Sequence, residues 1–236
     1  MKTSSFLLTI VMSLLMLSAC TEDIEDTGYR RQQSLKIQVF DANDSTKTRA
    51  TYSAFPAVTF ESGDQIGVYA VNGTTVVSTN IPFTFDGTEW TSTTGVGYNE
   101  NCTYYAYYPY VASPYTPNFS NSTINSKFST FITDASNKFH YANQSTKANF
   151  NASDLMISQG TVNNETFEVS FIMYHKKGLA VFDGNAQYTT FTGNIPFLVG
   201  TKKYFLMKPS TATTFNYGGS SCSLKASSGK YTIQDI

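Results

Sequence analysis

The feature that most constrains the fold is a series of short segments in which apolar and polar residues alternate. In Thr166–Tyr174, the apolar residues Phe167, Val169, Phe171 and Met173 alternate against Glu168 and Ser170. A period of two indicates a strand with one buried face. Turn residues separate these segments, and no helical periodicity longer than two turns follows the N-terminal stretch. We therefore expect an all-β sandwich and not an alternating βαβ fold.

Further strands are predicted along most of the chain. Gln65–Val71 alternates and is followed by Asn72-Gly73, a strong hairpin signal. Pro109 should end the strand Thr103–Tyr110 or place it near a sheet edge. Residues 112–154 are rich in Ser, Asn, Thr and Pro, and we expect short helical or irregular pieces around Asn125–Asp134. The other predicted strands are Leu35–Val39, Ala57–Phe60, Ile81–Phe85, Leu155–Ile157, Gly178–Phe182, Ile195–Val199, Lys203–Met207, Cys222–Lys225 and Lys230–Ile233.

The N-terminal segment has the pattern of an export signal. A basic start precedes the apolar run Phe6–Leu17, which is shorter than the roughly 20 residues that cross a bilayer. The run ends in Leu17-Ser18-Ala19-Cys20, which matches the lipobox of bacterial lipoproteins. This pattern predicts that residues 1–19 are a signal peptide and that Cys20 carries a lipid. The alternatives are an ordinary cleaved signal with a chance cysteine, or a short buried helix.

Residues 20–34 are predicted to tether the lipid to the folded part. They include the acidic stretch Thr21–Thr27, TEDIEDT, which resembles a surface-export signal of Gram-negative anaerobes. A solvated linker fits the same residues. We expect an outer-membrane lipoprotein at the cell surface, bound to the membrane through its lipid.

The composition excludes several classes of function. The formal net charge is −1, so the chain lacks the basic field that nucleic-acid binding requires. Charged residues make up 14% and aromatic residues 15%, which argues against disorder. Without residues 1–19, 217 residues remain (236 − 19), enough for one ordinary sandwich or two small ones. Besides Cys20, only Cys102 and Cys222 are present, either as a disulfide or as two free thiols.

The sequence contains no catalytic or metal-binding motif. Its two histidines, His140 and His175, do not have the spacing of a zinc site, and neither a phosphate-binding loop nor a nucleophile elbow is present. Cys102 and His175 could pair as thiol and imidazole, but the residues around Cys102 match no catalytic signature. We expect no enzymatic activity, no metal and no cofactor. His175 is expected to be structural, with its ring bonded to a backbone carbonyl, and His140 to be exposed.

The tyrosines of the segment Thr103–Tyr110 allow two interpretations. Tyr104, Tyr105 and Tyr107 could form a platform on which sugar rings stack, since aromatic faces bind apolar ring patches. Alternatively, one face of this strand fills the core and a loop covers the other face. The second interpretation is favoured.

An ordered set of motifs resembles the fimbrillin family, over roughly residues 35–235. Each motif alone is weak, but their order and spacing agree with the family, and the lipobox fits as well. The motifs are Thr48-Arg49-Ala50-Thr51, Phe60 to Tyr69, Phe85-Asp86-Gly87 with Trp90, Tyr104 to Tyr110, Asp154-Leu155-Met156, Phe171 to His175, Gly178-Leu179-Ala180, and Gly229 to Ile233.

The resemblance implies a transthyretin-like Greek-key β-sandwich. Residues 35–183 would form the fimbrillin-like N-terminal sandwich, and residues 184–236 would complete it or form a small second β unit. Members that polymerise usually carry two sizeable sandwiches, for which 217 residues is short. This favours a minor, tip or anchor subunit over a shaft subunit.

The resemblance also implies assembly by strand exchange. The exchangeable strand would contain Leu35, Ile37 and Val39, and a protease would cut between Arg49 and Ala50. A solvated loop arginine is the alternative for Arg49. The expected function is a fimbrial structural or accessory subunit that mediates adhesion. Its expected partners are other fimbrial subunits and a host protein or glycan; the alternative is a non-polymerising, glycan-binding surface lipoprotein.

Overall fold

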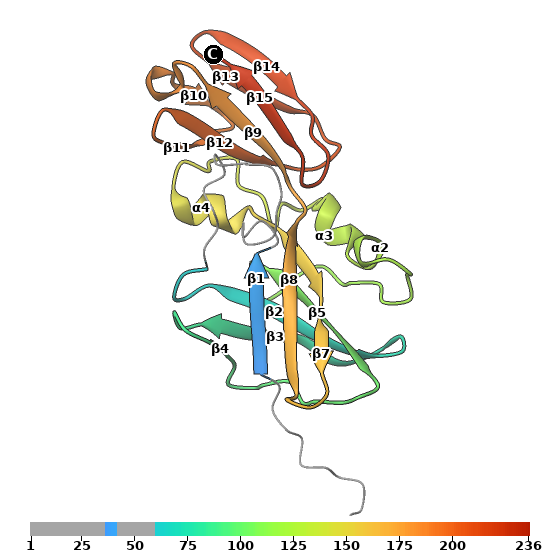
Figure 1. The fold of residues 1–236 in the computed structure, drawn as a ribbon. Coiled ribbons are helices and arrows are strands. Elements are labelled where there is room, and N and C mark those ends of the chain that lie inside the picture. Colours follow the sequence, from blue (N-terminus) through green and yellow to red (C-terminus); the bar gives the residue numbers. More distant parts are fainter. Residues whose placement is uncertain (1–35, 42–59) are drawn as a thin grey trace, which may run out of the picture. The chain divides into compact units, whose positions relative to one another are not determined.

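The structure, a computed structural model, describes residues 36–41 and 60–236. Residues 34–236 form one compact unit of the chain, and the other unit, residues 1–33, lies outside the described residues. The described part consists mainly of strands with a few short helices, which confirms the predicted all-β class (Figure 1). The Greek-key connectivity stays a prediction. Within residues 36–41 and 60–236, no helix is long and apolar enough to span a membrane.

The described elements are, in chain order, β1 (Lys36–Asp41), β2 (Gln65–Asn72), β3 (Thr75–Phe85), β4 (Trp90–Thr91), β5 (Cys102–Tyr108), α2 (Ile124–Lys127), α3 (Ser129–Thr133), α4 (Lys147–Ala152), β6 (Met156–Gln159), β7 (Thr161–Asn163), β8 (Glu168–His175), β9 (Gly178–Asp183), the 3₁₀ turn η1 (Ala186–Tyr188), β10 (Phe191–Thr192), β11 (Phe197–Val199), β12 (Lys202–Met207), β13 (Thr213–Tyr217), β14 (Ser220–Leu224) and β15 (Tyr231–Asp235).

The N-terminal sheet has eight strands in the order β1-β4-β3-β2-β5-β6-β8-β7. Strands β2 and β3 form the hairpin predicted at Asn72-Gly73, with Asn72 paired to Thr75. Gly73 has a φ of 60°, a left-handed conformation that glycine adopts without steric cost. Strand β5 ends at Tyr108, directly before Pro109, as predicted.

Both faces of the sheet are buried at its central strands, β2 and β5. On one face, β2 contributes Ile66, Val68 and Ala70, and β8 contributes Val169 and Phe171, to a single apolar cluster. On the other face, residues of β2 and β5 pack against rings from the segment between β5 and β6. The members of this second cluster from that segment include Phe119, Phe128, Phe131 and Phe139. A sheet covered in this way needs apolar residues at consecutive positions, which explains the buried run along β5.

The segment that covers the second face contains α2, α3 and α4, so the prediction of short helical pieces is confirmed. Thr123 caps α2 by accepting a hydrogen bond from the Ser126 backbone N–H, and Thr146 caps α4 through the Asn149 N–H. Such threonine caps satisfy N–H groups that a first helical turn leaves unpaired. Phe131 of α3 is fully buried and stacks on Phe139, with ring centroids 5.5 Å apart.

The C-terminal strands form two sheets, β11-β12-β9-β15 and β10-β13-β14. Phe182 of β9, Phe205 of β12 and Phe215 of β13 meet in their shared core, with centroid separations of 4.8 Å and 5.0 Å to Phe215. Strand β9 pairs with β12 and β15, so it belongs to these sheets. In the strand pairing, the change between the N-terminal sheet and these sheets falls between His175 and Gly178, and the expected division at residues 183 and 184 stays a prediction.

Hydrogen bonds and a ring contact join the segment between β5 and β6 to the C-terminal sheets. The Gln144 side chain is fully buried and bonds both backbone groups of Leu206, at 2.8 Å to its N–H and 3.0 Å to its carbonyl. Phe150 of α4 packs against Phe197 of β11, with centroids 5.4 Å apart. These contacts explain why residues 34–236 behave as one compact unit.

A buried ion pair lies at the same junction. The Lys177 ammonium is 3.2 Å from the Asp134 carboxylate, and both side chains are fully buried. Burial lowers the pKa of Lys177, and the Asp134 charge opposes this shift. Asp134 also accepts hydrogen bonds from the Tyr115 hydroxyl at 3.0 Å and from the Lys138 N–H at 2.7 Å. A buried charge is tolerated when it is paired and bonded in this way.

The two histidines lie in different settings. His175 Nδ1 is 2.7 Å from Oδ1 of the buried Asp154, so a carboxylate is one partner of its ring. The prediction that His140 is exposed is wrong, because its ring is half-buried against Phe205 with centroids 5.7 Å apart. Burial and the nearby Lys177 charge lower the pKa of His140 to about 4. The imidazole is therefore neutral at physiological pH.

Candidate subunit interface

Strand β1 closes the N-terminal sheet. It pairs in parallel with β8 over its whole length, from Lys36 opposite Glu168 to Asp41 opposite Met173. On its other side it meets β4 at a single position, Ile37 opposite Trp90. Figure 1 shows β1 and β8 side by side. Without β1, the sheet order would leave β8 and β4 as two open edges.

The side chain of Ile37 anchors β1 in the core. It is only 7% exposed and belongs to the cluster that contains Val169 and Phe171 of β8. Trp90 lies beside it in this cluster and stacks on Phe85 with centroids 5.2 Å apart. Apolar contacts of this kind contribute most of the free energy that holds a strand in a sheet.

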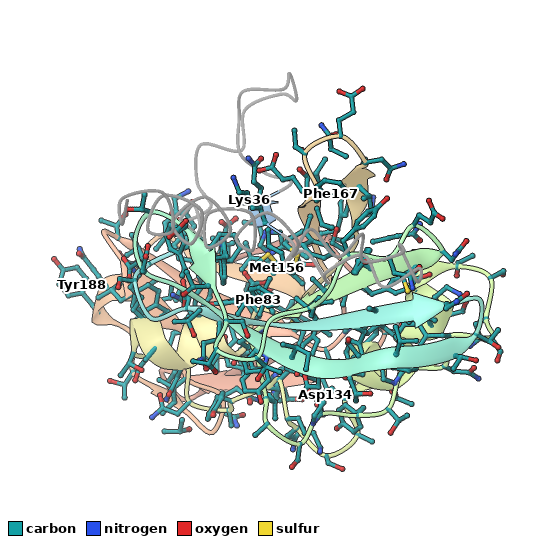
Figure 2. The ribbon with its side chains drawn as sticks, turned by 90° about the horizontal axis from the view of Figure 1, so that it is seen from below. Lys36, Phe83, Asp134, Met156, Phe167 and Tyr188 are labelled. Atoms are coloured by element: carbon teal, nitrogen blue, oxygen red, sulfur yellow. The ribbon has the colours of Figure 1, made fainter. Side chains whose placement is uncertain are left out.

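Polar contacts fix the register of β1. The Lys36 N–H donates to the Phe167 carbonyl at 3.3 Å, and the Gln38 side-chain amide donates to Glu168 at 2.5 Å. Figure 2 shows Lys36 and Phe167 near one another at this end of the sheet. The register places Ile37 opposite Val169 and Val39 opposite Phe171. Val169 and Phe171 are both fully buried.

Removing β1 would expose a slot lined by apolar side chains and by unpaired backbone groups. The apolar floor would include Val169, Phe171 and Met173, which have no exposed surface in the complete sheet. The outer edge of β8 would also lose its backbone partners over six paired positions. An inserted strand of suitable sequence satisfies both kinds of group. The geometry thus defines a slot that one strand fills.

The structure describes only some of the predicted site residues. Of the proposed exchangeable strand, Ile37 and Val39 lie in β1, and Leu35 lies outside the described residues. Cys20, Arg49 and Ala50 also lie outside the described residues, so the lipidation and the cleavage stay predictions. Along the sequence, Arg49 lies between β1 and β2.

Tyr104, Tyr105 and Tyr107 are buried, with exposures of 0%, 6% and 0%. Tyr104 faces one apolar cluster, and Tyr105 and Tyr107 face the other. Burial raises the pKa of all three phenols. The structure supports the core interpretation of this strand, since none of the three rings presents a free face for a sugar.

Cys102 and Cys222 are free thiols, the first buried and the second half-buried. Burial raises the pKa of each thiol, which opposes formation of a reactive thiolate. In the part of the chain that the structure describes, no group of three or more His, Cys, Asp or Glu side chains could hold a metal ion.

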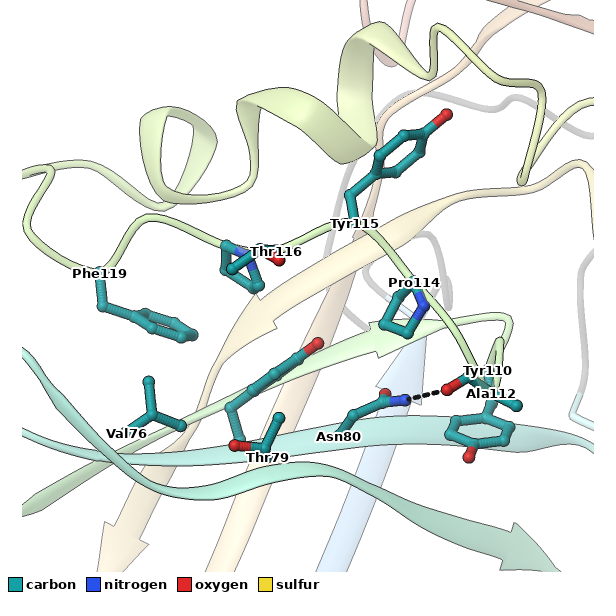
Figure 3. A pocket seen from close by; sticks show the side chains of 11 residues that line it. Val76, Thr79, Asn80, Tyr110, Ala112, Pro114, Tyr115, Thr116 and Phe119 are labelled. Carbon is teal, nitrogen blue, oxygen red and sulfur yellow. Dashed lines mark hydrogen bonds between the residues drawn. The ribbon is translucent and has the colours of Figure 1, made fainter.

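An open pocket of about 440 Å³ lies on the helical side of the N-terminal sheet, away from the slot. Figure 3 shows Phe119 and Tyr110 at its two ends, with Thr79 and Asn80 of β3 between them. Sequence reasoning missed this pocket. The signal available for it was the placing of Pro114 and Pro117 among aromatic residues in an otherwise polar segment.

Comparison with known sequences identifies the class of protein. The chain belongs to the fimbrillin-like family, whose sequence profile matches residues 48–235. The resemblance noted from the ordered motifs is thereby confirmed.

Individual relatives agree with this assignment. A proposed fimbrium tip subunit of Bacteroides ovatus, Fim1C, is 27% identical over 175 residues, which covers 70% of this chain and 32% of that protein. The crystal structure of a fimbrial protein from Bacteroides ovatus has a TM-score of 0.64 at 20% identity and covers 87% of this chain and 49% of that one. A proposed cell adhesion protein of the same species has a TM-score of 0.50 at 16% identity, over 88% and 92% of the two chains.

At these identities, the solved structures show a shared fold. The chain spans about a third of the length of the tip subunit and about half of the fimbrial protein.

Proposed function

We propose that the chain is a fimbrial structural or accessory subunit at the cell surface. We further propose that it assembles by strand exchange, in which a strand of a neighbouring subunit replaces β1. Family membership supports the fimbrial role, and the single observation that carries strand exchange is the position of β1. This strand fills a slot between β8 and β4, and the chain that joins it to β2 contains Arg49. Its partners in this scheme are other fimbrial subunits, and its role is structural and not enzymatic.

The distribution of arginine supports a cut beside β1. The chain contains three arginines, Arg30, Arg31 and Arg49, and all precede β2. Cleavage after each of them would free residues 32–49, which contain β1, and leave residues 50–236 intact. The free strand could then leave the slot, and a strand from a neighbouring subunit could enter it.

Treating the purified full-length chain with an arginine-specific protease should therefore produce oligomers, visible on a native gel. The Arg49→Lys variant is the matched control, because it keeps the positive charge but removes the cut between β1 and β2. In this variant β1 stays covalently attached, and the chain should stay monomeric. A wild-type chain that is cut at Arg49 and still runs as a monomer would count against strand exchange.

We further propose that Cys20 anchors the subunit to the outer membrane through its lipid. The lipobox supports this assignment. Cells that express the wild-type chain should incorporate labelled palmitate into it, and the Cys20→Ala variant should lose the label. Undiminished labelling of the variant would exclude Cys20 as the lipid acceptor.

A further inference from the structure

The pocket on the helical side has aromatic walls, hydroxyl groups and no charged side chain. Its lining residues are Tyr69, Val76, Thr79, Asn80, Tyr110, Ala112, Pro114, Tyr115, Thr116, Pro117 and Phe119. A volume of about 440 Å³ falls in the range of small-molecule sites. A charged ligand would find no counter-charge among these residues.

The Tyr69 hydroxyl is the pocket group set deepest among aromatic rings. Tyr69 is 2% exposed, and its ring packs between Phe119 and Phe128, with centroids 5.6 Å and 6.2 Å away. Its hydroxyl makes no hydrogen bond to any residue of 36–41 or 60–236. By contrast, the neighbouring Tyr107 hydroxyl bonds Asn80 at 2.6 Å. In the described part of the chain, the fully buried side-chain atoms without a partner are His140 Nδ1 and Asp154 Oδ2, so the Tyr69 hydroxyl is not one of them. It lines the pocket and can bond a ligand there.

Hydrogen bonds hold the rim of the pocket in place. The Asn80 amide donates to the Val111 carbonyl at 3.0 Å. The Lys127 ammonium donates to the Phe119 carbonyl at 2.9 Å, and Thr130 donates to the Thr116 carbonyl at 3.3 Å. Two prolines among the lining residues restrict the same loop further. A rim fixed before binding loses little conformational entropy when a ligand enters.

We propose that this pocket binds a neutral sugar ring, with the Tyr69 hydroxyl donating to or accepting from a sugar hydroxyl. Tyr110 is the lining ring that could pack on the apolar C–H patch of a pyranose, since Phe119 is buried against other rings. Thr79, Thr116 and Asn80 place further polar groups around the same space. No lining side chain is itself charged, and the nearby Lys127 and Lys138 ammonium groups contact the lining residues Phe119 and Tyr115. This inference goes beyond the fimbrial role and does not depend on strand exchange.

The test is an array of neutral and acidic oligosaccharides, followed by titration calorimetry of the best neutral glycan against the full-length chain. Tyr69→Phe should weaken binding about three- to tenfold, as expected for one lost hydrogen bond. Tyr110→Ala should weaken it at least as much. The matched control is Tyr98→Phe, which removes a hydroxyl that bonds Asn164 outside the pocket; its affinity should equal that of the wild type.

Three outcomes would overturn the proposal. They are a folded wild-type chain that binds no neutral glycan, exclusive binding of acidic glycans, and neutral binding that Tyr69→Phe and Tyr110→Ala both leave unchanged. Thermal unfolding of each variant establishes that it is folded, and Tyr69→Phe retains the ring that packs in the core. A monomeric product in the protease experiment would have no bearing on these results.

Discussion

Replacing Asp134 by alanine should lower the free energy of unfolding by about 3–5 kcal/mol, as measured by urea denaturation. The substitution leaves the Lys177 ammonium buried without its counter-charge, since the two groups are 3.2 Å apart and fully buried. It also removes the acceptor of the Tyr115 hydroxyl and of the Lys138 and Phe139 N–H groups. A domain is stabilised by about 5–15 kcal/mol in total, so this loss is large.

The matched control is Asp183→Ala. Asp183 pairs with Lys202 at 2.7 Å, but both side chains are more than a third exposed, so the substitution should lower the free energy of unfolding far less than Asp134→Ala does. Asp134 has a φ of 47°, a conformation that asparagine tolerates better than alanine, so Asp134→Asn separates backbone strain from charge. Adding Lys177→Met to Asp134→Ala should recover about 1–3 kcal/mol. Equal, small losses for Asp134→Ala and Asp183→Ala would contradict this account of the junction.

Replacing Ile37 by aspartate should release β1 from its slot. The side chain is 7% exposed among apolar residues, so a carboxylate there would be buried without a partner. We expect a loss of about 3 kcal/mol or more in unfolding free energy. Hydrogen exchange should accelerate at the β8 residues paired with β1, from Glu168 to Met173.

Ile172→Asp is the matched control, because it makes the same side-chain change on the neighbouring strand. Ile172 is 42% exposed on the outward side of β8, so the control should change stability by less than about 1 kcal/mol. If both aspartate variants had the same small effect, Ile37 would not anchor β1, and the slot would lose its main apolar contact.

Sequence reasoning found strands with and without a clear period of burial, and the period is clearest in β8. β8 shows the pattern that was predicted, with Val169, Phe171 and Met173 buried and Ile172 and Tyr174 exposed. β5 shows none, because the segment that contains α2 and α3 covers its second face. Only the structure shows this cover, so the sequence of β5 favoured the core interpretation of the tyrosines without excluding a sugar platform.

Elements with weak burial contrast were missed or shortened. The first half of β3 is exposed on both faces, so the predicted strand began at Ile81 instead of Thr75. β13 buries only Phe215, and β10 has two residues, which is too short for any periodicity. Of the predicted strand Ala57–Phe60, only Phe60 is described, and it lies outside the strands.

The site could be predicted only in part, because contacts between residues far apart in the sequence form it. The alternation in Leu35–Val39 predicted a strand, but the parallel pairing with β8 joins residues about 130 positions apart, which no local pattern encodes. The burial of His140 and the Asp134–Lys177 pair likewise depend on segments distant in the sequence. The pocket combines β2, β3 and the loop after β5, so the place of the Tyr69 hydroxyl in it could not be recognised from the sequence.

Native mass spectrometry of the chain after arginine-specific cleavage tests most directly whether β1 is exchangeable. Our account predicts assemblies that contain several copies of residues 50–236 and fewer copies of residues 32–49, since neighbouring strands would have taken the place of β1. A single species with one copy of each fragment would show that β1 stays in its slot after the cut, and would contradict the account.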